Sequence, residues 1–151
     1  MKLSAHFILS ELTRSQTAAR LGLANQPSAS QIAALKNLCE HVLEPVRGHF
    51  QTPIHPSSGY RSPALNAAIG GSANSQHCGG EAVDFAIAGV DHRNVVAWIE
   101  KNIPFDQLIL EFPQAEDVNA GWVHVSLVTG HNRRQSLTKT RNGVFVGFSA
   151  F

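Results

Sequence analysis

The sequence predicts an α+β fold in which helices pack on one side of a central antiparallel sheet. A segment that follows Ser28 has the 3.6-residue apolar repeat of a helix, whereas residues 82–87, 106–112 and 122–127 have the apolar content and alternation of strands. The length of 151 residues suits a chain with a single hydrophobic core. We therefore expect one domain that spans residues 1–151.

The main helix carries its own start and stop signals. Ser28 precedes Gln31 by three residues, which is the spacing of a capping box. Pro45 is expected to kink or end the helix near Glu44, because proline has no N–H to donate. The apolar residues share one broad face that we expect to cover the core: Ile32, Leu35, Leu38, Cys39, Val42, Leu43 and Val46.

Shorter helices are marked by residues typical of helix ends. A helical turn near the N-terminus is predicted to end at Gly22. Ser62 and Pro63 are the capping and first helical residues of a small helix. Asp91 is expected to cap a third helix that runs to about Asn102.

Strands account for most of the remaining apolar segments. Residues 51–60 predict a short strand followed by a turn, and residues 106–112 alternate with Leu108, Leu110 and Phe112 on one face. The tail from residue 129 is predicted to be a polar loop followed by a final apolar strand at 144–146.

Composition and charge exclude several classes of protein. The net charge of +1 does not favour nucleic acid or an anionic membrane as a partner, and no apolar run is long enough to span a bilayer. Residues 1–10 lack the apolar core and cleavage site of a signal peptide, so we expect a chain made in the cytoplasm. Cys39 and Cys78 are expected to be free thiols.

The stretch from Ser75 to Asp84 is the centre of the candidate site. It places His77 and Asp84 seven residues apart across a glycine pair, and His124 follows in an alternating strand. Two histidines and one aspartate are a normal ligand set for catalytic zinc, which keeps its fourth position for water. Each residue taken alone also has a purely structural explanation. His77 would be an ordinary loop residue, Asp84 would cap a turn, and His124 would be a buried, hydrogen-bonded histidine. We expect the other histidines to be surface or packing residues.

These residues form a recognisable pattern. Ser75-x-His77-x-x-Gly80-x-Ala82-x-Asp84, followed by Trp122-x-His124, resembles the motif of the zinc D-Ala-D-Ala peptidase family. That family includes bacterial D-Ala-D-Ala carboxypeptidases and dipeptidases and phage endolysins, and its fold is shared with the hedgehog signalling domain. The resemblance extends through residues 58–66 and covers roughly residues 30–128. The stretch at residues 6–12 is most similar to phage and prophage members.

The resemblance implies roles for named positions. His77, Asp84 and His124 would bind one Zn²⁺ per chain. Arg61 would hold a substrate carboxylate or polarise the scissile carbonyl, a role that suits its planar donor fork. Ser75 would form a hydrogen bond with the substrate at the edge of the site, or would only cap the turn.

The sequence departs from the family pattern at one position. Several members have an acid three residues before the second histidine, and Gly121 stands there in this chain. Glu111 is the predicted general base, because its strand is expected to pair with the strand of the second histidine. Glu116 and Asp117 on the intervening loop are the alternatives, and Glu81 is discounted because it alternates away from the site.

The predicted function is hydrolysis of a peptide bond in peptidoglycan stem peptides, as a carboxypeptidase or a murein endopeptidase of phage or prophage type. Such a protein would be a monomer that acts on the cell wall after release or within a virion, without nucleic acid or membrane as a partner. Two alternatives remain open. The missing acid at Gly121 favours a catalytically silent zinc-binding module, and the same fold is also suited to a cell-wall binding unit.

Overall fold

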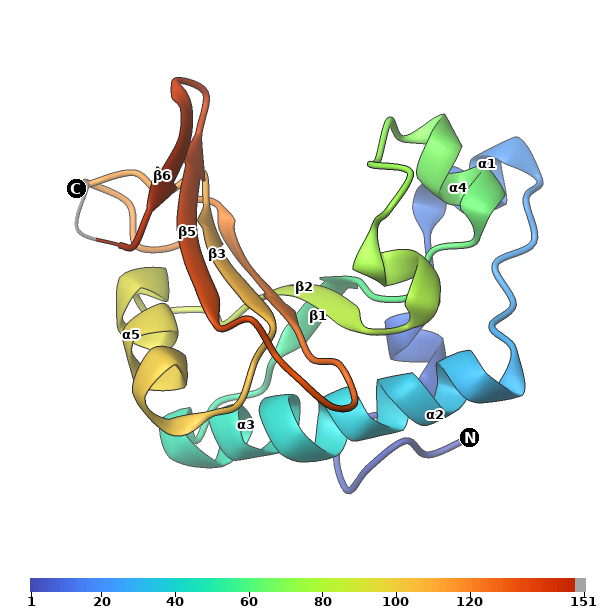
Figure 1. Ribbon diagram of the computed structural model, residues 1–151, viewed down its shortest axis with the longest axis horizontal. Helices are drawn as coiled ribbons and strands as arrows, with labels where there is room; N and C mark the ends of the chain where they lie inside the picture. Colours follow the sequence, from blue (N-terminus) through green and yellow to red (C-terminus); the bar gives the residue numbers. More distant parts are fainter. Residues whose placement is uncertain (149–151) are drawn as a thin grey trace.

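A computed structural model describes residues 1–148. Within these residues six strands form one sheet, in the order β1-β2-β4-β3-β5-β6 (Figure 1). The strands are β1 (His55–Ser58), β2 (Ala82–Ala86), β3 (Gln107–Glu111), β4 (Trp122–Ser126), β5 (Gln135–Thr140) and β6 (Gly143–Val146). The α-helices are α1 (Gln16–Leu21), α2 (Ala29–Leu38), α3 (Glu44–Phe50), α4 (Pro63–Ala68) and α5 (His92–Asn102). The 3₁₀ turns are η1 (Leu9–Leu12) and η3 (Gln76–Gly79), and η2 (Cys39–Leu43) is a π-helical turn.

The predicted α+β class is confirmed, with one difference in the sheet. Neighbouring strands are antiparallel except β3 and β5, which are parallel, so the sheet is mixed. The strand β5 was not predicted because its sequence contains a single strongly apolar residue, Leu137. The strand β4 ends beside the start of β3, and residues 127–134 carry the chain past that end of β3 to its other side, where β5 begins.

The hydrophobic core lies between the sheet and the helices α2, α3 and α5. The capping box of Ser28 and Gln31 is present at the start of α2. The predicted apolar face of this helix is buried at every position except Ile32, which packs against the core in a partly exposed state. Burial of this face against the sheet fixes which side of each strand remains open for a site.

Pro45 does not end the helix near Glu44, which was one of the two outcomes predicted for it. The π-helical turn η2 precedes it, and the N–H of Glu44 donates to the carbonyl of Cys39, five residues back. Pro45 then lies in the first turn of α3, where a missing N–H is tolerated. The wide turn thus lets two helical segments follow one another across a proline.

The predicted ends of the shorter helices are confirmed. Gly22 adopts a left-handed conformation at the end of α1, and the side chains of Ser62 and Asp91 cap α4 and α5. The helices α1 and α4 lie together at one end of the molecule, and the β5–β6 hairpin rises at the other end (Figure 1). Among residues 1–148 no helix is long and apolar enough to cross a membrane.

Candidate functional site

The three predicted ligands converge on the open face of the sheet. Asp84 and His124 are directly paired across the antiparallel strands β2 and β4, so their side chains point to the same face. The flanking residues Val83 and Phe85 point the other way, into the core. His77 joins them from η3, and one ligand atom from each of the three residues lies within 4.8 Å of the others.

A backbone carbonyl orients the imidazole of His77. The side chain is buried, and Nδ1 lies 2.7 Å from the carbonyl oxygen of Gly59. Only a protonated Nδ1 can donate to a carbonyl, so the lone pair is left on Nε2. Within residues 1–148 this buried Nε2 has no hydrogen-bond partner, and it lies 3.4 Å from Oδ2 of Asp84. A buried lone pair aimed at a carboxylate fits a metal ligand.

The carboxylate of Asp84 stays ionised between two imidazoles. Burial by itself raises its pKa, but the neighbouring imidazoles of His124 and His77 outweigh burial and hold the pKa well below its usual range. Oδ1 of Asp84 lies 2.9 Å from Nδ1 of His124. An ionised carboxylate and two imidazoles are donors that zinc accepts, so the residues present fit a divalent metal ion.

The turn that carries His77 explains two further residues of the motif. The Ser75 hydroxyl accepts a hydrogen bond from the backbone N–H of His77 and caps η3. Gly80 ends η3 in a left-handed conformation at φ 72°, and a Cβ there would collide with the carbonyl oxygen of Gln31 in α2. The motif therefore needs glycine at position 80 both for its backbone angle and for close packing on α2.

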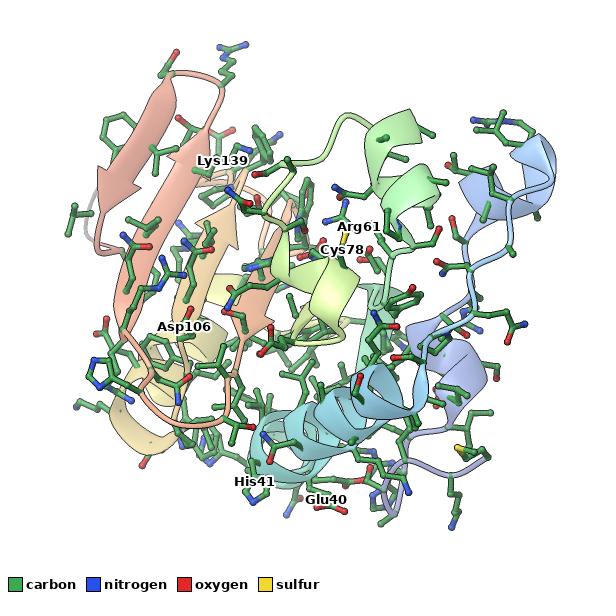
Figure 2. All side chains as sticks on the ribbon, turned by 45° about the vertical axis from the view of Figure 1, so that its right-hand side comes forward. Glu40, His41, Arg61, Cys78, Asp106 and Lys139 are labelled. Atoms are coloured by element: carbon green, nitrogen blue, oxygen red, sulfur yellow. The ribbon has the colours of Figure 1, made fainter. Side chains whose placement is uncertain are left out.

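A cleft of about 600 Å³ opens above the three residues. Arg61 enters it from the segment that follows β1, and Nη2 of Arg61 donates to the Ser75 hydroxyl over 3.4 Å. The buried Nε of Arg61 has no hydrogen-bond partner among the described residues. Ser75 thus both caps the turn and contacts Arg61, and Figure 2 shows Arg61 beside α4.

Glu111 lines the same cleft. Ile109 pairs with His124 and Glu111 pairs with Trp122, so the predicted pairing of these strands is confirmed and Glu111 shares a face with His124. Burial raises the pKa of Glu111, and the negative charge of Asp84 raises it further, while the nearby His124 opposes the shift. A buried carboxylate with a raised affinity for protons is suited to accept a proton from a reacting group.

The alternative acids are not brought to the cleft. Glu116 and Asp117 are exposed on the loop between β3 and β4, and Glu81 does not line the cleft either. Gly121 has φ 70°, and a Cβ at this position would collide with the backbone carbonyl of Glu111. This backbone has no room for an acidic side chain at position 121, which accounts for the departure from the family pattern.

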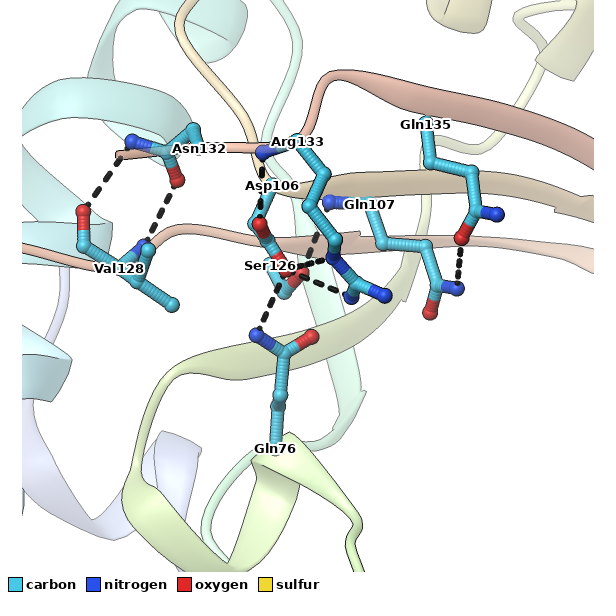
Figure 3. A network of polar contacts seen from close by, with 8 residues as sticks. All are labelled: Gln76, Asp106, Gln107, Ser126, Val128, Asn132, Arg133 and Gln135. Atoms are coloured by element: carbon cyan, nitrogen blue, oxygen red, sulfur yellow. Dashed lines mark hydrogen bonds and ion pairs between the residues drawn. The ribbon is translucent and has the colours of Figure 1, made fainter. Parts of the chain in front are cut away.

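A buried aspartate connects η3 to the segment that leads into β5 (Figure 3). Asp106 accepts hydrogen bonds from Gln76 Nε2 at 3.0 Å, from the Arg133 backbone N–H at 2.8 Å and from Nη2 of Arg133 at 2.7 Å. Gln76 precedes the predicted ligand His77, so this network supports the position of η3. Sequence reasoning missed it. Its one signal is an acidic residue between the apolar Phe105 and the strand β3.

We expect Asp106→Asn to lower the free energy of unfolding by about 1–2 kcal/mol at pH 7. The hydrogen bonds from Arg133 lower the pKa of Asp106 to about 2, and burial opposes them. A lowered pKa stabilises the fold at pH values above the usual aspartate pKa of about 3.9, and this stabilisation is lost as the pH falls towards about 2. Urea denaturation at pH 7 and at several values below pH 4 measures this difference.

The control for this substitution is Glu40→Gln. Glu40 is exposed on η2 (Figure 2), and its side chain forms no hydrogen bond or ion pair with the rest of residues 1–148. Its removal should change the unfolding free energy by less than about 0.5 kcal/mol. A stability difference for Asp106→Asn that persists unchanged below pH 2 would contradict the electrostatic explanation.

Several other residues have structural contacts that agree with their predicted packing or surface roles. His6 pairs with Glu44 at 2.8 Å, and His49 stacks on Trp98 with ring centroids 4.3 Å apart. The thiols of the described chain are free, as expected. Among residues 1–148, the trio of His77, Asp84 and His124 is the one group of His, Cys, Asp or Glu side chains arranged to hold a metal ion.

Comparison with known proteins gives one finding about the family. A family model described as Peptidase M15 matches residues 5–126. The match includes the trio, Arg61 and Glu111, and it ends at the last residue of β4. A search of curated protein sequences finds no match.

Proposed function

The chain belongs to the peptidase M15 family, and on that premise we propose that it is a zinc-dependent peptidase that hydrolyses a peptide bond in peptidoglycan stem peptides. The family match confirms the resemblance inferred from the motif. The observation that carries the proposal is the convergence of one ionised carboxylate and two imidazoles in a cleft whose wall holds the buried Glu111.

The metal ligands in this proposal are His77, Asp84 and His124, with one zinc ion per chain. The carbonyl of Gly59 fixes the tautomer of His77, which is the usual arrangement of a ligating histidine. When bound, zinc would supply Lewis-acid chemistry that activates water and polarises the scissile carbonyl.

The protein residues supply proton transfer and substrate orientation. Glu111 accepts a proton from the attacking water and returns it to the leaving amine, so that the amine departs neutral. Its burial supports this role, because a carboxylate in a low-dielectric wall holds a proton more readily than one in water. Arg61 binds a carboxylate or the scissile carbonyl oxygen of the substrate with the donors that remain free of Ser75.

Mass spectrometry of digested murein tests the proposal. Purified murein is incubated with the zinc-loaded protein and, as a control, with protein treated with a chelator. We expect zinc-dependent release of defined fragments. Loss of a single D-alanine indicates a carboxypeptidase, and release of larger peptides indicates an endopeptidase. The absence of fragments from protein that holds one zinc per chain would contradict the proposed activity.

One observation favours a second candidate, a catalytically silent zinc-binding module. The acid that several family members place at position 121 is excluded here by the backbone. This candidate predicts that the zinc-loaded protein binds murein sacculi and releases no peptide. The position of Glu111 beside the trio favours the peptidase, because it provides a carboxylate from a different strand.

A further inference from the structure

The β5 strand forms a wall of the cleft that the motif does not describe. It pairs in parallel with β3, and Lys139 is directly opposite Glu111 in this pairing. Paired residues of adjacent strands point to the same face, so Lys139 belongs to the face that carries the site. Lys139 accordingly lines the cleft together with Arg61, His124 and Glu111.

The ammonium group of Lys139 is available to a ligand. Within residues 1–148 it forms no ion pair or hydrogen bond with another side chain. Its Nζ lies 6.0 Å from the centroid of the Phe112 ring, and that ring packs at 5.3 Å on Trp122, which also lines the cleft. The aromatic pair borders the space that the lysine side chain can occupy.

Among residues 1–148, Arg61 is the one other cationic side chain of the cleft that no carboxylate engages. Arg133 is bound to Asp106, and Asp84 is held between the two imidazoles. Arg61 forms no ion pair among the described residues, and it enters from the β1 side of the sheet. Because β2 and β4 separate β1 from the β3–β5 side, Arg61 and Lys139 stand on opposite sides of Asp84 and His124.

We propose that Lys139 is a specificity-determining residue that binds an internal carboxylate of the substrate, on the side of the scissile bond opposite the group held by Arg61. This inference rests on the proposed function and specifies its substrate class as a peptide with two anionic groups. A stem peptide with a γ-linked D-glutamate has such an internal group, because the α-carboxylate of that residue remains free of the chain. Lys139 contacts the substrate and takes no part in proton transfer.

The test compares two peptides that differ in one charge. The first is L-Ala-γ-D-Glu-L-Lys-D-Ala-D-Ala with a free glutamate α-carboxylate, and the second carries an α-carboxamide there. Binding to the zinc-loaded protein is followed by stopped-flow tryptophan fluorescence, and hydrolysis is followed separately. We expect the acid to bind about three- to tenfold more tightly and to have a lower KM with a similar kcat, since the contact is partly exposed. This preference should shrink in 0.5 M salt.

Variants of Lys139 assign the preference to this side chain. Lys139→Gln should bind both peptides equally, and Lys139→Arg should retain most of the preference for the acid. The matched control is Arg141→Gln, because Arg141 lies on the same hairpin but lines a separate hollow with Phe112 and Phe145. Arg141→Gln removes one positive charge, as Lys139→Gln does, and should keep the wild-type preference for the acid over the amide. A merely structural role for Lys139 would not separate acid from amide.

The outcomes distinguish this inference from the proposed function. Equal binding of both peptides by the wild type, or a wild-type preference in Lys139→Gln, would overturn the role of Lys139, even when hydrolysis proceeds. A preference that depends on Lys139 without any hydrolysis would support the role of Lys139 and contradict the peptidase. Hydrolysis together with a Lys139-dependent preference supports both.

Discussion

Replacing Glu111 by glutamine is expected to lower kcat by a factor of about 10²–10⁴, the usual contribution of a general base. Glutamine has nearly the same shape as glutamate, but its amide cannot accept a proton at neutral pH. Glu111 is buried in the cleft wall beside the trio and is not one of the predicted ligands, so the variant should keep one zinc per chain. Steady-state hydrolysis of a stem peptide, together with metal analysis of the same sample, measures both quantities.

Glu116→Gln and Asp117→Asn are the matched controls. Both residues are acids of the same chain, and both are exposed on the loop that follows β3. Each variant should retain turnover within about twofold of the wild type, since neither side chain lines the cleft. Full activity in Glu111→Gln, with loss in either loop variant, would transfer the role of base to the loop.

Replacing His77 or His124 by alanine is expected to reduce bound zinc from one per chain to nearly none after dialysis against a chelator. Each substitution leaves two protein ligands, whereas catalytic zinc sites in proteins are held by three. Hydrolysis should be lost together with the metal. Inductively coupled plasma mass spectrometry of the dialysed protein provides the metal content, and circular dichroism shows whether the fold persists.

His41→Ala is the control for these two variants. His41 is exposed on η2 (Figure 2) and does not line the cleft, and among residues 1–148 its side chain hydrogen-bonds only to the carbonyl of Asn37. This variant should hold as much zinc as the wild type. One zinc per chain in a folded His77→Ala or His124→Ala protein would refute the ligand assignment.

The sequence was sufficient to predict the convergence of the candidate ligands, for a physical reason. Asp84 and His124 lie in strands whose alternation fixes the face of every side chain, so their meeting depends only on the pairing of β2 with β4. The same alternation placed Glu111 beside His124. The structure brings these side chains together, while zinc binding and the role of Glu111 remain predictions.

The features that sequence reasoning missed depend on backbone atoms or on weak patterns. The carbonyl of Gly59 that orients His77 has no side chain to reveal it. The strand β5 is too polar for its alternation to be visible, and with it the position of Lys139 on the cleft wall could not be foreseen. The helical continuation across Pro45 needed a π turn, which no local residue pattern specifies.

The proposed catalytic groups and the proposed substrate contact of Lys139 lie in separate parts of the chain, which meet through the parallel pairing of β3 with β5. The trio, Arg61 and Glu111 all lie within the region that matches the family, whereas Lys139 lies beyond its last matched residue, on a hairpin added to the sheet after β4. With the roles proposed above, substitutions in the hairpin would alter which peptide is bound and would leave the proposed reacting groups in place. Exchange of this hairpin is then expected to change the substrate preference without changing the trio.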